Sequence, residues 1–381
     1  MGHSIESEFG PIRRVVIKVG TRVLTGGGKR LHVSRLVAVA EVAADLRQSG
    51  RDVILVSSGA VGLGRRALGI PTHRSSEPGE REACAAVGQS RLMGLYQDAF
   101  AQLDLVCGQI LLTEGAFDDR HRYLQLRDTL TALLRCGVVP VINEDDAVPP
   151  ESLGHGAQTI FAENDRLAAL VATKLGADLL VLLTDVDGLY DRDPRQDPTA
   201  QRIARLPVNE IKPEDSSDAA PGEESRGGMR SKLEAASIAS RSGCHALIAS
   251  GNDPQALMRF LSGEDVGTWI PCQGSLDARK RWIAFAAAAR GALHLDEGAV
   301  RALRERQTSL LAVGVRRVEG DFHRGDIVEL RDSAGVVIGR GLMHFDADTA
   351  REWCSGRPPE DVRSGHALIR RDELVLEVSK P

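Results

Sequence analysis

Short apolar runs of strand length alternate with helical patterns along this chain. Residues 15–20 read VVIKVG, residues 33–50 carry apolar side chains three and four positions apart, and residues 52–64 begin with DVILV. The same alternation recurs in residues 127–148 and 164–190. Strands that alternate with helices in this way form a mostly parallel sheet covered by helices on both faces. The pattern therefore predicts an α/β fold.

Small or polar residues stand at the ends of four of the predicted strands. In open parallel sheets, ligands bind beyond the carboxyl ends of the strands. We therefore expect one polar cleft along this edge of the sheet. The four strand ends are KVGT at 18–21, SSGA at 57–60, NEDD at 143–146 and TD at 184–185.

Lys18 is unusual because it ends a run of branched apolar residues. Burying an ammonium group is costly unless an anion meets it. Glycines at 20, 26–28, 59 and 62 provide backbone N–H groups that can approach a phosphate, and helix N-termini that follow such loops favour anions. The sequence has neither a GxxxxGK[ST] loop nor a complete GxGxxG fingerprint, so the common nucleotide motifs are missing. A phosphate ligand is still the natural prediction.

A second combination of glycine and lysine lies in residues 225–243, SRGGMRSKLEAASIASRSG. Gly227 and Gly228 precede a predicted helix, and Lys232 lies in its first turn. This segment predicts a second phosphate cradle, with a solvated surface lysine as the alternative interpretation of Lys232.

Eight segments, in their order along the chain, resemble those of the glutamate 5-kinase family of the amino acid kinase superfamily. The resemblance covers about residues 11–270. The resemblance implies an αβα sandwich that transfers the γ-phosphoryl group of ATP to the side-chain carboxylate of L-glutamate, the first step of proline synthesis. Aspartate and N-acetylglutamate kinases are the near alternatives. The segments are VVIKVGTRVLTGG, VSSGAVGLGR, AAVGQSRLM, LLTEGAFDDRHRYLQLRDTL, VPVINEDDAV, ENDRLAALVA, LLTDVDGLYDRDPR and RGGMRSKLEAA.

The resemblance also implies roles for individual residues. Lys18 and Lys232 would neutralise the migrating phosphoryl group, and Asp165 would hold both lysines. Ser58, Asp146 and Asn164 would bind glutamate, with Asp146 facing the α-ammonium group. ATP would bind with Mg²⁺ held mainly by phosphate oxygens, without a metal cage made by the protein. Its implied contacts are Lys18, Thr184, Asp185, Arg226, Gly227, Gly228, Met229, Arg230, Ser231 and Lys232.

The sequence departs from the family pattern in two places, and a polar segment precedes the second. Ala162 and Glu163 stand where many relatives have Gly-Asp, which puts the glutamate affinity in question. Arg226 and Ser231 stand where threonines are frequent. Residues 209–225 are polar and acidic, which predicts a segment without fixed structure when no nucleotide is bound, either a lid or an idle insertion.

The composition changes after residue 270. Residues 271–288 are predicted to link the kinase domain to a small β-rich domain at 289–366, with short alternating strands and turn residues at 332–335. This domain resembles the PUA family, which also occurs in RNA-modifying enzymes. It contains twelve Arg and no Lys against thirteen Asp and Glu, so its composition shows no basic stripe for RNA. An RNA-associated protein with the kinase fold as sensor or scaffold is the alternative function.

Composition adds two expectations about the setting of the protein, and the resemblance adds a third. The net charge of −5 gives no general attraction to nucleic acid or anionic membranes. The six cysteines are scattered without a CxxC pair, and neither a signal-peptide core nor a run of about 20 apolar residues occurs, so we expect a soluble cytoplasmic protein. The resemblance further implies a homo-oligomer that proline inhibits by feedback.

Overall fold

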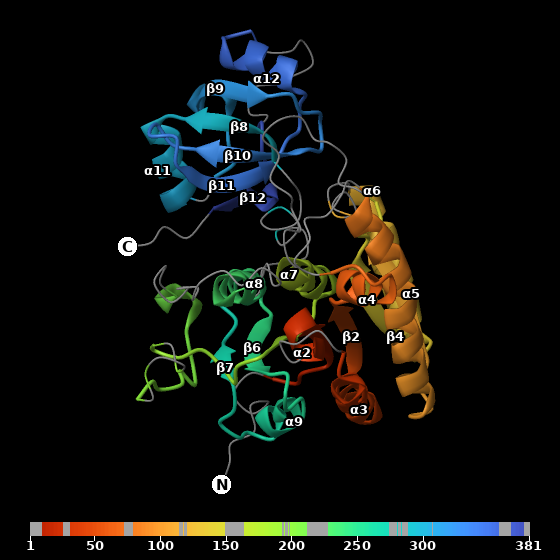
Figure 1. Ribbon diagram of the computed structural model, residues 1–381. Coiled ribbons are helices and arrows are strands. Elements are labelled where there is room, and N and C mark those ends of the chain that lie inside the picture. Colours follow the sequence, from red (N-terminus) through yellow and green to blue (C-terminus); the bar gives the residue numbers. More distant parts are fainter. Residues whose placement is uncertain are drawn as a thin grey trace. The chain divides into compact units, whose positions relative to one another are not determined.

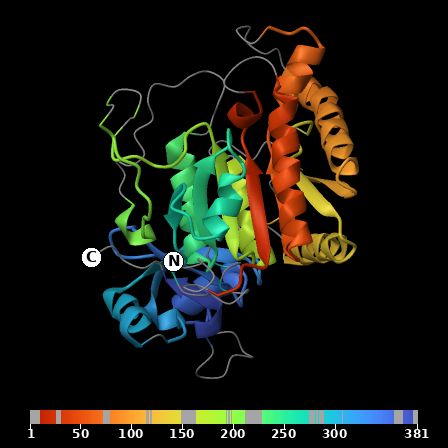
Figure 2. The same cartoon turned by 90° about the horizontal axis from the view of Figure 1, so that it is seen from below.

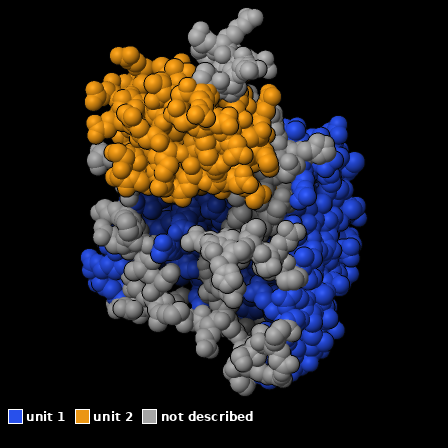
Figure 3. All heavy atoms as spheres, turned by 90° about the horizontal axis from the view of Figure 1, so that it is seen from above, with its two compact units in different colours: residues 1–116, 120–275 blue, residues 117–119, 276–381 orange. Residues whose placement is uncertain are grey.

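The structure is a computed structural model, and it divides the chain into two compact units. Unit 1 comprises residues 1–116 and 120–275, and unit 2 comprises residues 117–119 and 276–381 (Figure 3). The residues described are 10–25, 31–71, 79–113, 117, 120–148, 164–192, 194, 197, 199–211, 228–273, 280, 283, 289–306, 308–357 and 367–376.

Unit 1 is built on a seven-stranded sheet with the strand order β3-β4-β2-β1-β5-β6-β7. Neighbouring strands are parallel except β6 and β7, which are antiparallel. The prediction of a mostly parallel sheet is confirmed. The strands are β1 (Arg14–Val19), β2 (Asp52–Ser57), β3 (Cys107–Leu112), β4 (Val139–Glu144), β5 (Leu179–Thr184), β6 (His245–Ser250) and β7 (Thr268–Ile270).

Helices cover both faces of this sheet (Figures 1 and 2). On one face, Val15 and Ile17 of β1 pack in one apolar cluster with residues of α3, α5 and α9. Side chains alternate along a strand, so Lys18 belongs to the other face, where α7 and α8 lie. The helices are α2 (Thr21–Thr25), α3 (Val33–Gln48), α4 (Ala60–Ala67), α5 (Glu80–Ala101), α6 (Arg120–Arg135), α7 (Asn164–Leu175), α8 (Met229–Arg241) and α9 (Ala256–Leu261).

The order of the strands along the chain reverses its direction across the sheet at β1. The chain passes from β1 to β2 on one side and later returns to β5 on the other side. Lys18 is paired in register with Val56 of β2 and Leu182 of β5, so it lies between two fully apolar neighbours. Ligands of open α/β sheets bind at such a switch point, beyond the carboxyl ends of the strands.

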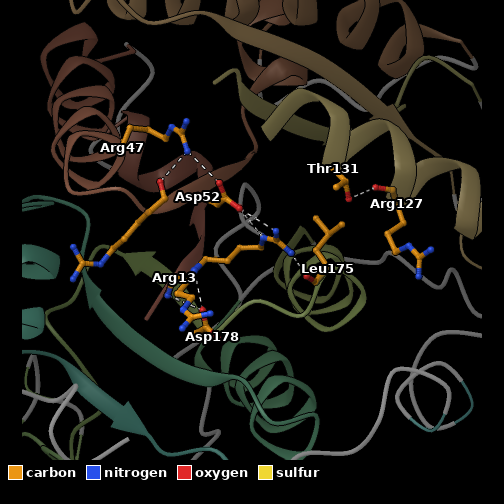
Figure 4. A network of polar contacts seen from close by, with 9 residues as sticks. Arg13, Arg47, Asp52, Arg127, Thr131, Leu175 and Asp178 are labelled. Carbon is orange, nitrogen blue, oxygen red and sulfur yellow. Dashed lines mark hydrogen bonds and ion pairs between the residues drawn. The ribbon is translucent and has the colours of Figure 1, made fainter. Parts of the chain in front are cut away.

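At the opposite, amino-terminal end of the sheet, a network of hydrogen bonds and ion pairs connects the strands to a neighbouring helix (Figure 4). The carboxylate of Asp178 accepts hydrogen bonds from the backbone N–H groups of Arg13 at 2.7 Å and Arg14 at 2.8 Å. The Arg14 guanidinium lies 3.0 Å from Asp52, and Arg47 of α3 lies 3.1 Å from the same carboxylate. These contacts join the starts of β1 and β2 to α3 and to the turn before β5.

Helices α4 and α5 approach each other so closely that only glycine fits at two positions. A Cβ atom on Gly64 would lie 1.8 Å from the carbonyl oxygen of Cys84. A Cβ atom on Gly88 would lie 1.7 Å from the carbonyl oxygen of Ala60. Real carbon and oxygen atoms do not approach so closely, so the two helix backbones are in direct contact here.

Unit 2 has its own five-stranded sheet, in the order β12-β11-β10-β8-β9. β8 and β10 are parallel and the other neighbours are antiparallel. The predicted turn is present, with the N–H of Gly335 donating to the carbonyl of Asp332 at 3.0 Å. The prediction of a β-rich domain is confirmed. The elements are β8 (Ala289–Leu295), α11 (Glu297–Arg306), β9 (Val315–Gly320), β10 (Ile327–Arg331), β11 (Val337–Leu342), α12 (Ala347–Cys354) and β12 (Leu374–Leu376).

Unit 2 encloses a separate apolar core. Leu293 of β8, Val328 and Leu330 of β10, and Phe322 are almost completely buried in it. In the parts of both units that the structure describes, no helix is long and apolar enough to cross a membrane.

Candidate active site

Three charged side chains meet beyond the carboxyl end of β1. Lys18 Nζ lies 2.6 Å from Asp165 Oδ1, and Lys232 Nζ lies 3.3 Å from Asp165 Oδ2. The Ser231 hydroxyl donates to Asp165 Oδ2 at 2.8 Å. Lys18 and Lys232 are each 6% exposed and Asp165 is 0% exposed, so water screens these charges very little.

The two lysines keep Asp165 ionised. Burial by itself would raise the pKa of this carboxyl group, because a charge is disfavoured away from water. The ammonium groups of Lys18 and Lys232, together with hydrogen bonds from Lys18 and Ser231, outweigh burial and hold the pKa of Asp165 well below its usual range. Two ammonium groups facing one carboxylate carry a net positive charge. The cluster is therefore suited to an anion.

Local backbone features bring these side chains together. Gly20 leaves space for the lysine, since a Cβ atom there would lie 3.3 Å from Lys18 Nζ. Asp165 occupies the first turn of α7, where the helix dipole favours a carboxylate. In the first turn of α8, the Ser231 hydroxyl and Lys232 Nζ lie 3.0 Å and 3.4 Å from the carbonyl oxygen of Gly228.

A chain of amide hydrogen bonds leads from α5 to the residue before Asp165. Asn143 Nδ2, at the end of β4, donates to Gln89 Oε1 at 2.9 Å. This contact directs Asn143 Oδ1 toward Asn164, whose Nδ2 donates to it at 3.1 Å and to Ser58 Oγ at 2.7 Å. We call the residues Gln89, Asn143, Asn164 and Ser58 the amide relay.

The amide relay leaves one acceptor unused. Asn164 Oδ1 is buried and has no hydrogen-bond partner among the residues that the structure describes. A buried carbonyl oxygen without a donor costs about 1–3 kcal/mol, so a bound donor such as an ammonium group would stabilise this site. In this orientation of the amide, Asn164 Nδ2 serves Asn143 and Ser58, and Oδ1 is left for a ligand.

Asp146 follows β4 and contacts α5. Its Oδ1 lies 2.5 Å from Arg81 NH2, in the first turn of that helix. The Asp146 side chain is 15% exposed and the Arg81 side chain 41% exposed. The carboxylate predicted to face an α-ammonium group therefore already has a cationic partner.

The nucleotide-side residues lie at β5 and at the start of α8. Thr184 Oγ1 donates to Asp185 Oδ1 at 3.1 Å, and Arg22 of α2 lies 3.7 Å from Asp185 Oδ2. Arg230 forms an exposed pair with Glu234 at 3.0 Å. Gly228 caps α8 and Met229 begins it. Val208–Glu210 form a short 3-10 helix, so the prediction of no fixed structure for residues 209–225 is wrong at its start. Arg226, Gly227, Ala162, Glu163 and residues 212–225 lie outside the described residues, so the lid hypothesis stays a prediction.

Apart from the nucleotide-side residues, the structure thus places the predicted residues in two adjoining groups, and pairs Asp146 with Arg81. Lys18, Asp165, Ser231 and Lys232 form the charged cluster. Ser58 and Asn164 belong to the amide relay, which adjoins this cluster because Asn164 and Asp165 are consecutive residues. Asp146 contacts Arg81 and shares the end of β4 with the relay.

Sequence reasoning missed the partners of several predicted residues. Gln89 and Asn143 stood in matched segments, but nothing in the sequence marked them as a hydrogen-bonded pair. Arg22 and Arg81 were also missed. Arg81 offered a signal, because a cation in the first turn of a helix opposes the helix dipole and so calls for an anionic partner.

Comparison with known proteins identifies the family of this chain. The family model described as Amino acid kinase family matches residues 13–250, and the PUA domain model matches residues 291–363. A glutamate 5-kinase from Marinomonas sp. (strain MWYL1) is 41% identical over 96% of this chain and 97% of its own length. The glutamate 5-kinase of Thioalkalivibrio sulfidiphilus is 44% identical over 97% and 98%, and that of Deinococcus radiodurans 45% identical over 95% and 99%. The chain therefore belongs to the glutamate 5-kinase family, with the amino acid kinase fold and a C-terminal PUA domain.

Proposed function

We propose that this protein transfers the γ-phosphoryl group of ATP to the side-chain carboxylate of L-glutamate, forming L-glutamyl 5-phosphate for proline synthesis. The observation that carries the proposal is the charged cluster of Lys18, Asp165 and Lys232 directly beside the amide relay. One group suits a transferred phosphate and the other suits an amino acid. They adjoin in a chain of the glutamate 5-kinase family.

The charged cluster performs the chemistry by neutralising repulsion. Both reactants are anions, and the migrating phosphoryl group concentrates negative charge in the transition state. Lys18 and Lys232 stabilise that charge from fixed positions, which requires little reorganisation during the reaction. Asp165 is the positioning residue that holds both ammonium groups. No general base is required, because the attacking carboxylate is already ionised.

The amino-acid end binds the rest of glutamate. The orphaned Asn164 Oδ1 and the carboxylate of Asp146 are acceptors for the α-ammonium group. The Ser58 hydroxyl accepts a hydrogen bond from Asn164 Nδ2 at 2.7 Å, and we assign it to the same glutamate site. These groups orient glutamate so that its side-chain carboxylate points to the charged cluster, which converts a bimolecular encounter into a positioned reaction.

Nucleotide binding falls to the ends of β5 and α8. A kinase of this family uses ATP, and we assign its contacts to Lys18, Thr184, Asp185 and residues 226–232. We propose that Mg²⁺ would be held mainly by the phosphate oxygens of ATP, as is usual for this ion at nucleotide sites. The ion would supply further neutralisation of phosphate charge.

Several properties of the family complete the proposal. We propose a cytoplasmic homo-oligomer that proline inhibits by competing with glutamate. The domain limits 11–270, 271–288 and 289–366 are proposed likewise. No finding on this chain favours the alternative of an RNA-associated protein.

The proposal is tested by trapping the product. Purified protein with ATP, Mg²⁺ and L-glutamate should form an acyl phosphate that hydroxylamine converts to a hydroxamate. Parallel reactions with aspartate and N-acetylglutamate are the controls within the superfamily. A higher kcat/KM for either control would overturn the substrate assignment, and RNA binding without glutamate-dependent ADP release would favour the alternative.

A further inference from the structure

Arg81 lies in the first turn of α5, at the positive end of the helix dipole. A guanidinium group is disfavoured there unless an anion compensates it. Its neighbours Glu80 and Glu82 are acidic, yet the ion pair that Arg81 forms is with Asp146, 65 residues away in the sequence. The contact therefore joins α5 to the polar strand end that we assign to the amino-acid pocket.

The pair of Arg81 and Asp146 complements the head of an amino acid. The α-ammonium and α-carboxylate groups of an amino acid are bound to one carbon atom, so their partners must also be neighbours. Arg81 NH2 and Asp146 Oδ1 are 2.5 Å apart, which places a cation and an anion side by side. If the head of an amino acid bound beside this pair, its α-carboxylate would face Arg81 and its α-ammonium group would face Asp146.

Arg81 also retains donors for a ligand. A guanidinium carries five N–H donors in a planar fork that matches a carboxylate, and the contact with Asp146 involves NH2. The side chain is 41% exposed, so the rest of the fork is accessible. Lys18 and Lys232 are committed to Asp165 and to the phosphoryl end.

We propose that Arg81 binds the α-carboxylate of the amino-acid substrate while Asp146 accepts its α-ammonium group. This inference rests on the proposed function. It adds Arg81 as the residue that makes the protein prefer an α-amino acid to an amine that has the reacting carboxylate but no α-carboxylate. Arg81 is then a substrate-binding residue, and its pairing with Asp146 prepares both groups before glutamate arrives.

The experiment compares L-glutamate with 4-aminobutyrate, which keeps the ammonium group and the reacting carboxylate but lacks the α-carboxylate. The readout is the ratio of kcat/KM for glutamate to that for 4-aminobutyrate. If 4-aminobutyrate reacts too slowly, its competitive inhibition constant against glutamate takes the place of its kcat/KM. The variants are Arg81→Met, Arg81→Lys, which keeps the charge, and Arg91→Met, which removes an exposed arginine from the same helix.

Arg81→Met should reduce this ratio by about 10- to 150-fold, as expected for a lost charged hydrogen bond. Arg81→Lys should recover part of the loss, and Arg91→Met should leave the ratio unchanged. An equal loss on both compounds would overturn the inference, because Arg81 would then act only by positioning Asp146. Absence of glutamate phosphorylation by the unmodified protein would instead contradict the proposed function. Thermal unfolding of each variant separates these outcomes from misfolding.

Discussion

The two ends of β1 carry the same kind of contact in different surroundings. At its start, Arg14 NH2 lies 3.0 Å from Asp52 Oδ2, with side chains 26% and 31% exposed. Near its end, Lys18 Nζ lies 2.6 Å from Asp165 Oδ1, with side chains 8% and 0% exposed. Both distances are normal for ion pairs, so burial is what distinguishes the two ends.

This difference in burial suits the two ion pairs to different roles. The partly exposed pair at the start of β1 suits a structural role, and the buried pair near its end suits a catalytic one. A partly exposed pair is screened by water and contributes little stability, about 0–1 kcal/mol. A buried pair loses several kcal/mol of hydration for each ion, so it is a weak reason for stability by itself. The net positive charge of the cluster instead suits the anionic phosphoryl group that we propose as its ligand.

The largest expected effect is the loss of turnover when Lys18, in the buried cluster near the end of β1, is replaced. Lys18→Met should lower kcat by about two to four orders of magnitude, because electrostatic stabilisers of a transition state contribute about 3–5 kcal/mol. Steady-state ADP release at saturating glutamate and ATP measures it. Arg14→Met, at the other end of the same strand, is the matched control and should keep kcat. Equal losses in both variants would mean that the effect comes from the strand and not from the cluster.

The second effect is on stability at the same buried end. Asp165→Ala should lower the free energy of unfolding by about 3–5 kcal/mol, since two buried ammonium groups lose their counter-ion. Urea unfolding measures this loss, followed by the fluorescence of Trp269 of unit 1 in a background in which Trp282 and Trp353 are replaced by Phe. The pKa of Asp165 in the folded protein lies below the usual 3.8. The stabilisation that the Asp165 carboxylate contributes is therefore complete above pH 3.8, and it disappears as the pH falls through the lower pKa of the folded protein. A difference between wild type and variant that already shrinks at about pH 6 would contradict the assignment.

The third effect concerns the pair of Arg81 and Asp146, whose side chains are 41% and 15% exposed. Asp146→Ala should raise the KM for glutamate by about 10- to 150-fold, because one charged hydrogen bond to the α-ammonium group is lost. The KM for ATP should change little, as expected when the binding of one substrate is affected. Initial rates with each substrate varied in turn provide the test. Similar increases in both KM values would show that Asp146 supports the cleft wall.

The smallest effect is expected at the exposed end. Asp52→Ala removes the shared partner of Arg14 and Arg47, and should lower the free energy of unfolding by about 1 kcal/mol at most, with kcat unchanged. The loss should diminish with added salt, because exposed charges are screened. A salt-independent loss of several kcal/mol would mean that this network is as decisive as the buried one.

Much of the fold could be predicted because it rests on local patterns. Apolar runs and helical periodicity placed β1, α3 and β4 within a residue or two. Helix α4 was not predicted, because AVGLGR follows a strand directly and has two glycines. In the structure Gly59, with φ of 112°, ends the strand segment and caps the helix. That backbone conformation is one that glycine adopts without strain.

The site could be predicted only in part, because its contacts connect residues far apart in the sequence. Lys18 was conspicuous as a cation on an apolar strand, and the family resemblance pointed to Asp165 and Lys232. The direction of the amide in Asn164 depends on Gln89, 75 residues earlier, acting through Asn143. No periodicity in the sequence encodes such a hydrogen bond. It follows from the packing of α5 beside β4.

The glycine contact between α4 and α5 limits how the substrate range of this protein can change. Helix α4 follows Ser58, and α5 carries both Gln89 and Arg81. Because the backbones touch at Gly64 and Gly88, neither helix can shift closer to the other when an acceptor with a longer or shorter carbon chain binds. A new specificity must therefore arise by exchanging side chains on an unchanged backbone. Engineering for other amino acids should begin with those side chains and leave both glycines in place.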